Sequence, residues 1–229
     1  MPYYPTMQDM LREVYDYLWL FYKRPSDTKR IEEIITAMRI ADRKFFVDSA
    51  DEAYLNNALP VGKSQTISQP STVARMLMLA ELFPDLDVLE VGSASGWNGS
   101  LLAYLVYHGK VLSIEVINTL SEKAKANLNK LKTSFSDEKI EKFKNLEFKT
   151  TNFFNLTAGK KFDRVIITAG ITPDQEKKIE LAAKNLLRDN GILICPYSSG
   201  PMVIFKKHNS QISKSYTPEA YAFVPLVNH

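Results

Sequence analysis

The chain has 229 residues, of which 45% are hydrophobic and 24% are charged. This balance is typical of a folded globular protein, and the length suits one α/β domain with an extension. The longest apolar stretches, at residues 17–22 and 76–80, are far shorter than the ~20 residues that span a bilayer, so no membrane span is expected. The net charge is +3, and acids interrupt the loose basic cluster at residues 123–149, which favours a solvated helical face over a nucleic-acid groove.

The first 84 residues are expected to form a mainly helical N-terminal extension. Hydrophobic periodicity predicts an amphipathic helix over residues 6–23, with an aromatic face, that is ended by Pro25. Ser26 or Asp27 is expected to cap a second helix over residues 27–40. The aromatic face favours core packing over a ligand site, although a docking face for a partner stays open.

Residues 41–70 carry few periodic signals and are expected to form an ordered connecting segment. A third helix is predicted over residues 70–83, because Val73, Met76 and Ala80 recur at helical spacing.

From residue 87 onward, short apolar strands alternate with helices. The predicted strands cover residues 87–92, 111–116, 146–151, 163–168 and 191–197, and the predicted helices cover residues 98–107, 120–132 and 173–187. This alternation indicates an α/β fold with a doubly wound, mostly parallel sheet of the Rossmann-like kind. The last segments, residues 202–207, 212–216 and 220–226, are predicted to be antiparallel strands that close the sheet edge. Residues 85–229 would form the core, and the whole chain one integrated domain.

A glycine turn follows the first of these strands. Residues 90–96 read Glu-Val-Gly-Ser-Ala-Ser-Gly, and Glu115 ends the next strand, 23 residues after Gly92. Such a turn lets the backbone approach a ligand at a helix N-terminus, and a carboxylate at the end of the second strand can accept both hydroxyls of a ribose. The sequence therefore predicts a nucleoside-containing ligand, although a tight turn that binds nothing stays open.

Two phosphate-binding motifs fit this chain poorly. The dinucleotide motif Gly-x-Gly-x-x-Gly is missed twice, at Ala94 and Trp97. Residues 62–64, Gly-Lys-Ser, end like a phosphate-binding loop, but Asn57 stands where the first glycine must be. What remains resembles the S-adenosylmethionine site of class I methyltransferases.

The upstream segment narrows this resemblance to one family. Residues 58–70 read Ala-Leu-Pro-Val-Gly-Lys-Ser-Gln-Thr-Ile-Ser-Gln-Pro and lead into a predicted helix. They closely resemble the protein-L-isoaspartate O-methyltransferase family, in which a Leu-Pro-Ile-Gly step leads into Gln-Thr-Ile-Ser-Gln-Pro. Further matches stand in family order at residues 42–47, 88–92, 113–115, 162–169, 187–196 and 223–226, so that the resemblance covers about residues 30–227.

The resemblance implies an S-adenosylmethionine-dependent carboxyl methyltransferase that acts on isoaspartyl residues of damaged proteins and peptides and thereby initiates repair. In the family the Thr-Ile-Ser loop closes over the cofactor and presents the substrate carboxylate, which implies catalytic roles for Thr66 and Ser68. The implied cofactor-binding residues are Glu90, Gly92, Ser93, Ser95, Gly96, Glu115, Asn152, Phe153 and Thr168. The implied substrate-binding residues are Gln65, Ile67, Val224 and Pro225.

Several of these residues have a plain structural alternative. Thr66 and Ser68 could cap the helix that starts near Pro70. Thr168 could be an ordinary strand end, and residues 224–225 an apolar strand tip.

The chain also departs from the family pattern. Residues 151–153, Thr-Asn-Phe, replace the usual Gly-Asp-Gly, which removes a charge beside the expected adenine position. Ser64 and Ala94 replace glycines, so their backbone angles are expected to be ones that a Cβ tolerates. These changes leave open a methyltransferase for another acceptor, such as a small molecule or RNA, and a non-catalytic cofactor-binding adaptor.

The cysteine and histidine residues indicate no disulfide and no metal site. The single cysteine, Cys195, excludes an internal disulfide and is expected to be a small core residue, and His108, His208 and His229 are too scattered to share a metal. The first ten residues lack the pattern of a secretory signal, so a cytoplasmic location is expected. We expect a monomer or weak dimer that binds no nucleic acid.

Overall fold

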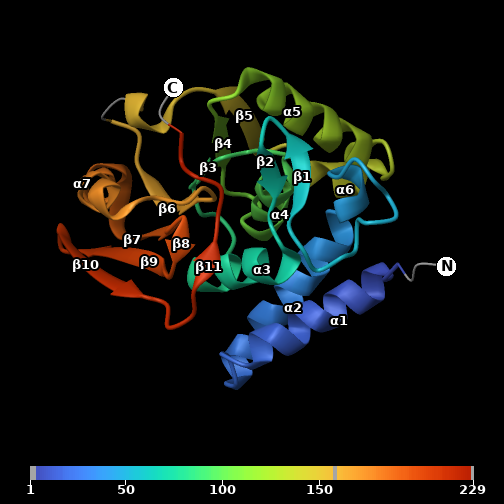
Figure 1. The fold of residues 1–229 in the computed structure, drawn as a ribbon, viewed down its shortest axis with the longest axis horizontal. Coiled ribbons are helices and arrows are strands. Elements are labelled where there is room, and N and C mark those ends of the chain that lie inside the picture. The colour runs from blue at the N-terminus through green and yellow to red at the C-terminus, as the bar shows by residue number, and fades with distance from the viewer. Residues whose placement is uncertain (1–3, 157–158, 228–229) are drawn as a thin grey trace.

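A central sheet organises the molecule, for which the computed structural model describes residues 4–156 and 159–227 (Figure 1). In this described part, seven strands lie in the order β10-β9-β7-β6-β3-β4-β5. The five parallel strands are β3 (Val88–Val91), β4 (Val111–Glu115), β5 (Leu146–Thr150), β6 (Phe162–Ile167) and β7 (Leu187–Pro196). The antiparallel strands β9 (Met202–His208) and β10 (Gln211–Tyr216) extend the sheet beyond β7. The predicted mostly parallel, doubly wound sheet is confirmed.

The strand order reverses at β3. Val88 lies opposite Val111 of β4 on one side and opposite Arg164 of β6 on the other. In open α/β sheets, ligands bind outside the carboxyl ends of the strands at such a switch point. The glycine turn of residues 92–96 follows β3 at this point.

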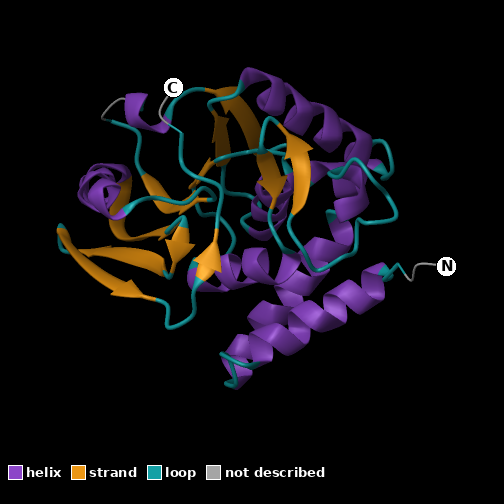
Figure 2. Ribbon diagram, in the orientation of Figure 1, coloured by secondary structure: helices purple, strands orange, loops and turns teal. Residues whose placement is uncertain are grey.

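Helices cover both faces of the sheet (Figure 2). Side chains alternate between the faces along each strand: Val88 packs in the cluster that contains the buried residues of α1 to α5, whereas Leu89 packs in the cluster that contains those of α7. The helices are α1 (Met7–Trp19), α2 (Pro25–Ile40), α3 (Pro70–Leu79), α4 (Trp97–Leu105), α5 (Asn118–Lys132), α6 (Asp137–Glu141) and α7 (Glu176–Leu186). Short 3-10 turns occur at Arg43–Phe45, Phe153–Asn155 and Pro173–Gln175. Cys195 is fully buried in β7, as expected of a core residue.

The first two helices differ from the prediction at their boundaries. Helix α1 ends at Trp19 rather than near residue 23, and Pro25 is the first residue of α2 instead of the terminator of α1. Proline fits there because the first helical N–H has no intrahelical partner. The N-cap is Arg24, not Ser26 or Asp27, and its backbone N–H donates to the Asp27 carboxylate.

The connecting segment contains a hairpin that the sequence analysis missed. Strands β1 (Leu59–Gly62) and β2 (Gln65–Ile67) pair antiparallel around a two-residue turn, with Gly62 opposite Gln65. Lys63 and Ser64 have φ values of +53° and +56°. Two positive φ values in succession define the hairpin turn that usually carries Asn-Gly. Lys-Ser is an unusual sequence for this turn, which is why the hairpin was not predicted.

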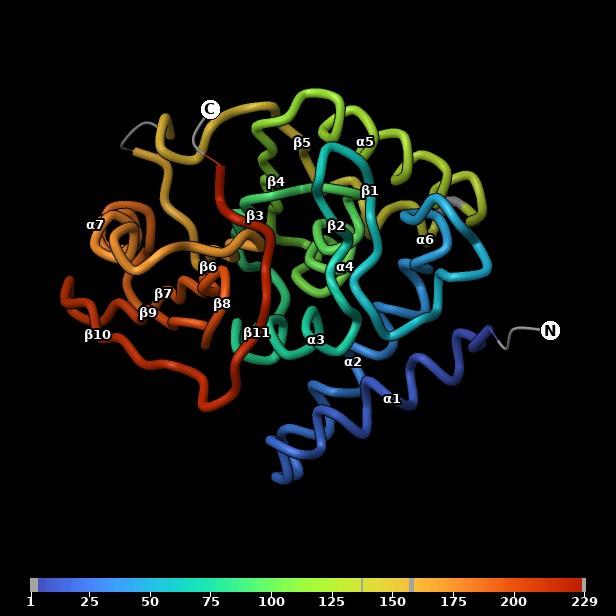
Figure 3. Tube along the Cα trace, viewed as in Figure 1, coloured from blue at the N-terminus to red at the C-terminus, as the bar shows by residue number. Residues whose placement is uncertain are grey.

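Two of the three predicted C-terminal strands, β9 and β10, close the sheet edge as expected, but the prediction is wrong for residues 220–226, which do not join the main sheet. Strand β11 (Tyr221–Ala222) pairs instead with β8 (Ser199–Gly200), outside the main sheet. Beyond β11 the chain crosses the carboxyl ends of the strands (Figure 3), where the Gly170 N–H donates to Val224 O at 2.7 Å and the Leu226 N–H to Gly170 O at 2.8 Å. We call residues 219–227 the C-terminal strap.

Candidate functional site

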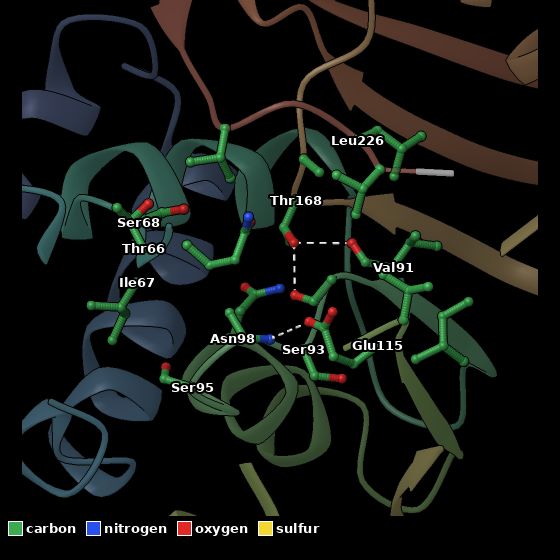
Figure 4. A pocket seen from close by; sticks show the side chains of 18 of the residues that line it. Thr66, Ile67, Ser68, Val91, Ser93, Ser95, Asn98, Glu115, Thr168 and Leu226 are labelled. Carbon is green, nitrogen blue, oxygen red and sulfur yellow. Dashed lines mark hydrogen bonds between the residues drawn. The ribbon is translucent and has the colours of Figure 1, made fainter. Parts of the chain in front are cut away.

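A pocket opens at the switch point, between the glycine turn, the β1–β2 hairpin and the C-terminal strap (Figure 4). It encloses about 870 Å³ of space between protein atoms, its open mouth included. Figure 4 shows Thr66, Ile67 and Ser68 on one side of the pocket, with Val91, Glu115 and Thr168 on the other.

Most of the site residues expected from the sequence line this pocket. They are Gln65, Thr66, Ile67, Ser68, Gly92, Ser93, Ser95, Glu115, Phe153, Thr168, Val224 and Pro225. Lining residues that the sequence analysis did not single out are Met76, Asn98, Ile114, Val116, Leu226 and Val227. Asn98 stands in the first turn of the helix after the glycine turn, which is a signal that could have identified it.

The glycine turn needs glycine at its first position. Gly92 has a φ of +100°, and a Cβ built there would lie 2.5 Å from the Thr168 hydroxyl oxygen. That hydroxyl lies 2.9 Å from Val91 O and 2.8 Å from Gly92 O, so it binds the backbone of the turn (Figure 4). Thr168 thus holds the bare backbone of residue 92 at the pocket wall.

The substituted positions adopt a different geometry from the one expected. Ala94 and Ser64 have φ values of +44° and +56°, in the left-handed region that favours glycine. A Cβ occupies this region only at a cost of roughly 1–2 kcal/mol. The chain therefore keeps a glycine-like backbone at both positions, with alanine and serine in strained conformations.

Glu115 joins the second strand to the turn. Its side chain is almost buried, with a residue exposure of 6%. One carboxylate oxygen accepts the N–H of Ala94 at 3.0 Å, and the other accepts the N–H of Ile117 at 3.1 Å. An ionised carboxylate can accept about four hydrogen bonds, so each oxygen retains acceptor capacity for a ligand hydroxyl.

Three expected cofactor residues lie outside the pocket lining. Glu90 is fully buried behind the turn, where it accepts hydrogen bonds from the Asn98 amide at 2.8 Å and from the Ser113 hydroxyl. Gly96 is the N-cap of α4, and the Asn152 side chain accepts the N–H of Phe154 at 2.9 Å. Their direct contact with a ligand is therefore not supported by their placement.

Glu90 instead anchors a buried polar network beneath the turn. The hydroxyls of Ser93 and Ser113 lie 2.6 Å apart, and Ser113 donates onward to Glu90. Burial raises the pKa of Glu90 to about 7, although the hydrogen bonds from Ser113 and Asn98 oppose the rise. A Cβ at position 99 would lie 2.7 Å from this carboxylate, so Gly99 leaves space for it.

A buried arginine holds the segment that carries Thr66 and Ser68. The Arg43 guanidinium donates to four backbone carbonyls, those of Ala53, Leu55, Asn57 and Ser68, at 2.8 to 3.2 Å. Burial lowers its pKa to about 10, so it stays protonated at neutral pH. The sequence analysis noted Arg43 only as part of a matching segment, because its partners lie 10 to 25 residues further along the chain.

The first turn of α3 is capped from a distance. The N-cap is Gln69, and the Asn56 side chain accepts the N–H of Ser71 at 3.0 Å while its amide donates to the Ser71 hydroxyl at 2.8 Å. Asn56 therefore performs the capping that was the structural alternative for Thr66 and Ser68.

The described residues contain neither a metal-binding cluster nor a membrane-spanning helix. In residues 4–156 and 159–227, no group of three or more His, Cys, Asp or Glu side chains could hold a metal ion. His208 bonds Asn190, His108 is exposed, and His229 lies outside the described residues. Within the same ranges, none of the helices is long and apolar enough to cross a membrane.

Comparisons with known proteins agree with this architecture. A chain from Plasmodium falciparum, described as a protein-L-isoaspartate O-methyltransferase in complex with S-adenosyl-L-homocysteine, superposes with a TM-score of 0.78 at 18% identity, covering 97% of this chain and 99% of that one. A second solved protein-L-isoaspartate O-methyltransferase gives 0.73 at 20% identity, covering 97% of this chain and 66% of that one. The fold is that of the class I methyltransferases.

Sequence similarity identifies the family within this class. Residues 21–229 match the family described as Protein-L-isoaspartate(D-aspartate) O-methyltransferase (PCMT). A protein-L-isoaspartate O-methyltransferase from Photobacterium profundum is 37% identical over 202 residues, which cover 86% of this chain and 88% of that protein. One from Serratia proteamaculans is 36% identical over 203 residues, with coverages of 86% and 89%. The chain belongs to the protein-L-isoaspartate O-methyltransferase family.

Proposed function

We propose that this protein uses S-adenosylmethionine to methylate the α-carboxylate of isoaspartyl residues in damaged proteins and peptides, which initiates their repair. The observation that carries the proposal is that one pocket joins the glycine turn and Glu115 to the family's Thr-Ile-Ser loop. Family membership supports the same activity. When bound, S-adenosylmethionine would supply an electrophilic methyl group to the substrate carboxylate.

The residues around the glycine turn fit this cofactor. Glu115 would accept the two ribose hydroxyls with its remaining lone pairs. Residues 92–95 would lie against the methionyl part, because the bare backbone at Gly92 permits a close approach. Phe153, which is 5% exposed and lines the pocket, would contact the adenine.

The residues of the Thr-Ile-Ser loop would orient the acceptor. An isoaspartyl α-carboxylate is already ionised at pH 7, so the enzyme needs geometry rather than a general base. The hydroxyls of Thr66 and Ser68 would donate to this carboxylate and hold it in line, without a tight ion pair that lowers its nucleophilicity. Such alignment is worth up to ~7–11 kcal/mol of the barrier.

The outer part of the pocket would bind the peptide. Gln65 and Ile67 belong to strand β2, and Val224 and Pro225 belong to the C-terminal strap on the other side of the opening. These four residues would contact the peptide on either side of the isoaspartyl residue.

The test supplies a radiolabelled methyl donor with an isoaspartyl peptide and with the matching aspartyl peptide. The expected result is base-labile label on the isoaspartyl peptide alone. Label on RNA or on a small molecule, but on neither peptide, would assign another acceptor. Binding of S-adenosylhomocysteine with no transfer to any acceptor would identify a cofactor-binding adaptor.

We further propose that residues 1–84 and 85–229 form one integrated domain, because one hydrophobic cluster contains Met10 and Ile31 of the extension as well as Val88 and Leu101 of the core. A single cooperative unfolding transition is expected. The monomeric or weakly dimeric state, the cytoplasmic location and the absence of nucleic-acid binding stay predictions.

A further inference from the structure

We propose that the aromatic N-terminal helix positions the substrate wall of the pocket by fixing the C-terminal strap. The contact runs through five side chains, which we call the strap anchor: Tyr17, Tyr22, Arg75, Glu219 and Tyr221. The proposal rests on the proposed function where it names the wall as substrate-binding. The positioning itself is a property of the protein without substrate.

The strap side of the anchor is built around Glu219. One of its carboxylate oxygens accepts a hydrogen bond from Arg75 Nε at 2.6 Å and another from the Tyr221 hydroxyl at 2.5 Å. Burial works to raise the pKa of Glu219, but these two hydrogen bonds outweigh it and keep the pKa below its ordinary value. Glu219 is therefore an anion at neutral pH, held by a cation and a neutral phenol.

The other side of the anchor comes from α1 and the turn that follows it. The hydroxyls of Tyr17 and Tyr221 lie 3.2 Å apart, and Arg75 also bonds the Tyr22 hydroxyl. The guanidinium carbon of Arg75 lies 4.5 Å from the ring centroid of Phe21 and 5.0 Å from that of Tyr22. The early end of α1 at Trp19 thus turns Phe21 and Tyr22 toward Arg75.

The geometry connects the anchor to the pocket in two ways. Helix α3 carries Arg75 between Val73 and Met76, both of which line the pocket. On the strap, Tyr221 precedes Val224 by three residues, or about 10 Å of extended chain. Residues 224–227 line the pocket, so a displacement at residues 219–221 reaches its wall within one short segment.

Charge and burial favour a positioning role over a purely stabilising one. The side chains of Arg75 and Glu219 are 7% and 19% exposed. A buried ion pair contributes little net stability, because desolvation offsets the attraction, but it penalises any arrangement that separates the two charges. The pair therefore specifies where the strap lies.

The anchor gives a structural role to helix α1, which precedes the residues matched by the family model. The family model matches residues 21–229, so Tyr17 and all of α1 lie outside that match. In the anchor, α1 contacts the strap through Tyr17. An element outside the family-model match thus acts on a pocket wall that lies inside it.

The experiment compares Tyr17→Phe and Glu219→Gln with Tyr15→Phe, a matched loss of a hydroxyl on the same helix. Amide hydrogen exchange, measured without substrate, is expected to speed up about two- to tenfold at residues 221–227 in Tyr17→Phe and more in Glu219→Gln, in line with the loss of one neutral or one charged hydrogen bond. Exchange in β3 and β4 should not change, and Tyr15→Phe should behave like the wild type.

Kinetics add a second readout with the isoaspartyl peptide. Both anchor variants should raise the peptide KM, Glu219→Gln more than Tyr17→Phe, while kcat changes less than about twofold, because they alter the wall and not the reacting groups. Unchanged exchange at residues 221–227, or equal acceleration throughout the protein, would overturn the positioning role. If the wild type fails to methylate the peptide, the proposed function fails, but the exchange result still decides the inference.

Discussion

The two walls of the pocket are held in different ways. The sheet wall, formed by residues 91–95 and Glu115, follows strands β3 and β4, whose register is set by backbone hydrogen bonds along the centre of the sheet. The loop wall, formed by residues 65–68 and 224–227, belongs to a short hairpin and the C-terminal strap. Its position depends on two buried side chains from other segments of the chain. Arg43 bonds the backbone of Ser68, just after the hairpin, and Arg75 bonds Glu219 of the strap.

Because the two walls are held differently, substitutions are expected to affect them differently. A backbone ladder tolerates many side chains but admits little movement, so the sheet wall is suited to holding the cofactor in one place. A wall held by a few long side chains can be altered by single substitutions far from the pocket. Substrate preference in this protein should therefore be sensitive to residues that do not touch the substrate.

The largest effect is expected when the support of the loop wall is removed. Arg43→Met leaves four carbonyl oxygens without their present donor, and each unpaired buried group costs about 1–3 kcal/mol. The free energy of unfolding should fall by about 3–5 kcal/mol, as measured by chemical denaturation. Lys44→Met, at a neighbouring side chain that is 48% exposed, is the control and should change it by at most ~1 kcal/mol. Equal losses in the two variants would contradict the role of Arg43.

Protein stability is also expected to depend on pH through Glu90, which lies beneath the sheet wall. The pKa of Glu90 is about 7 in the folded protein against 4.5 ordinarily, so its contribution to stability is present below about pH 4.5 and lost as the pH rises through 7. Glu90→Gln removes this titration and should gain up to ~3 kcal/mol relative to wild type between pH 5 and pH 8. Unfolding free energies of the cofactor-free protein at several pH values check this. Glu147→Gln, at an exposed position of β5, is the control substitution. A difference between Glu90→Gln and the wild type that does not vary with pH would rule out the raised pKa.

Cofactor binding by the sheet wall depends on Glu115. Glu115→Gln should weaken binding of S-adenosylhomocysteine by about 1–3 kcal/mol, because the amide keeps one acceptor oxygen but loses the charge-assisted pair of hydrogen bonds to the ribose. Calorimetric titration measures the effect, with Glu147→Gln again as control. Unchanged affinity would show that Glu115 only organises the turn through Ala94.

Ser68 of the loop wall is expected to be needed for turnover. Ser68→Ala is expected to lower kcat on an isoaspartyl peptide by about tenfold, with the melting temperature nearly unchanged, because Asn56 caps α3. Asn56→Ala should show the opposite pattern, a loss of about 0.5–2 kcal/mol of stability with turnover per folded molecule largely kept. A Ser68→Ala variant that melts early yet methylates normally would refute its catalytic role.

The smallest effect concerns backbone strain, which occurs in the sheet wall at Ala94 and in the hairpin turn next to the loop wall at Ser64. Ala94→Gly and Ser64→Gly should each raise the free energy of unfolding by about 0.5–1 kcal/mol, since glycine relieves the left-handed strain but loses more entropy on folding. Ala103→Gly, inside helix α4, should lower it. Thermal melts of the three variants compare the signs, and destabilisation by all three would exclude strain at positions 64 and 94.

Some residues of the site lie where the sequence predicts them, and others do not. Gly92 and Glu115 were placed together correctly because the carboxyl ends of adjacent parallel strands meet at one edge. Glu90 belongs to the same motif, yet it lies behind the turn, because strand alternation directs it to the opposite side from its neighbours. The β1–β2 hairpin was missed because Lys63 and Ser64 lack the turn preference of Asn-Gly.

The strand-helix alternation, the switch-point turn and the family could be predicted from the sequence alone, since each depends on spacing or on contiguous residues. Other features became visible only in the folded protein: α1 ends at Trp19, residues 223–227 cross the pocket instead of closing the sheet, and Arg43 and Arg75 hold the loop wall. The reason is that sequence patterns reflect only short-range interactions along the chain. Periodicity and turn chemistry act between residues a few positions apart, whereas Arg75 meets Glu219 across 144 residues, and no local pattern records such a partner.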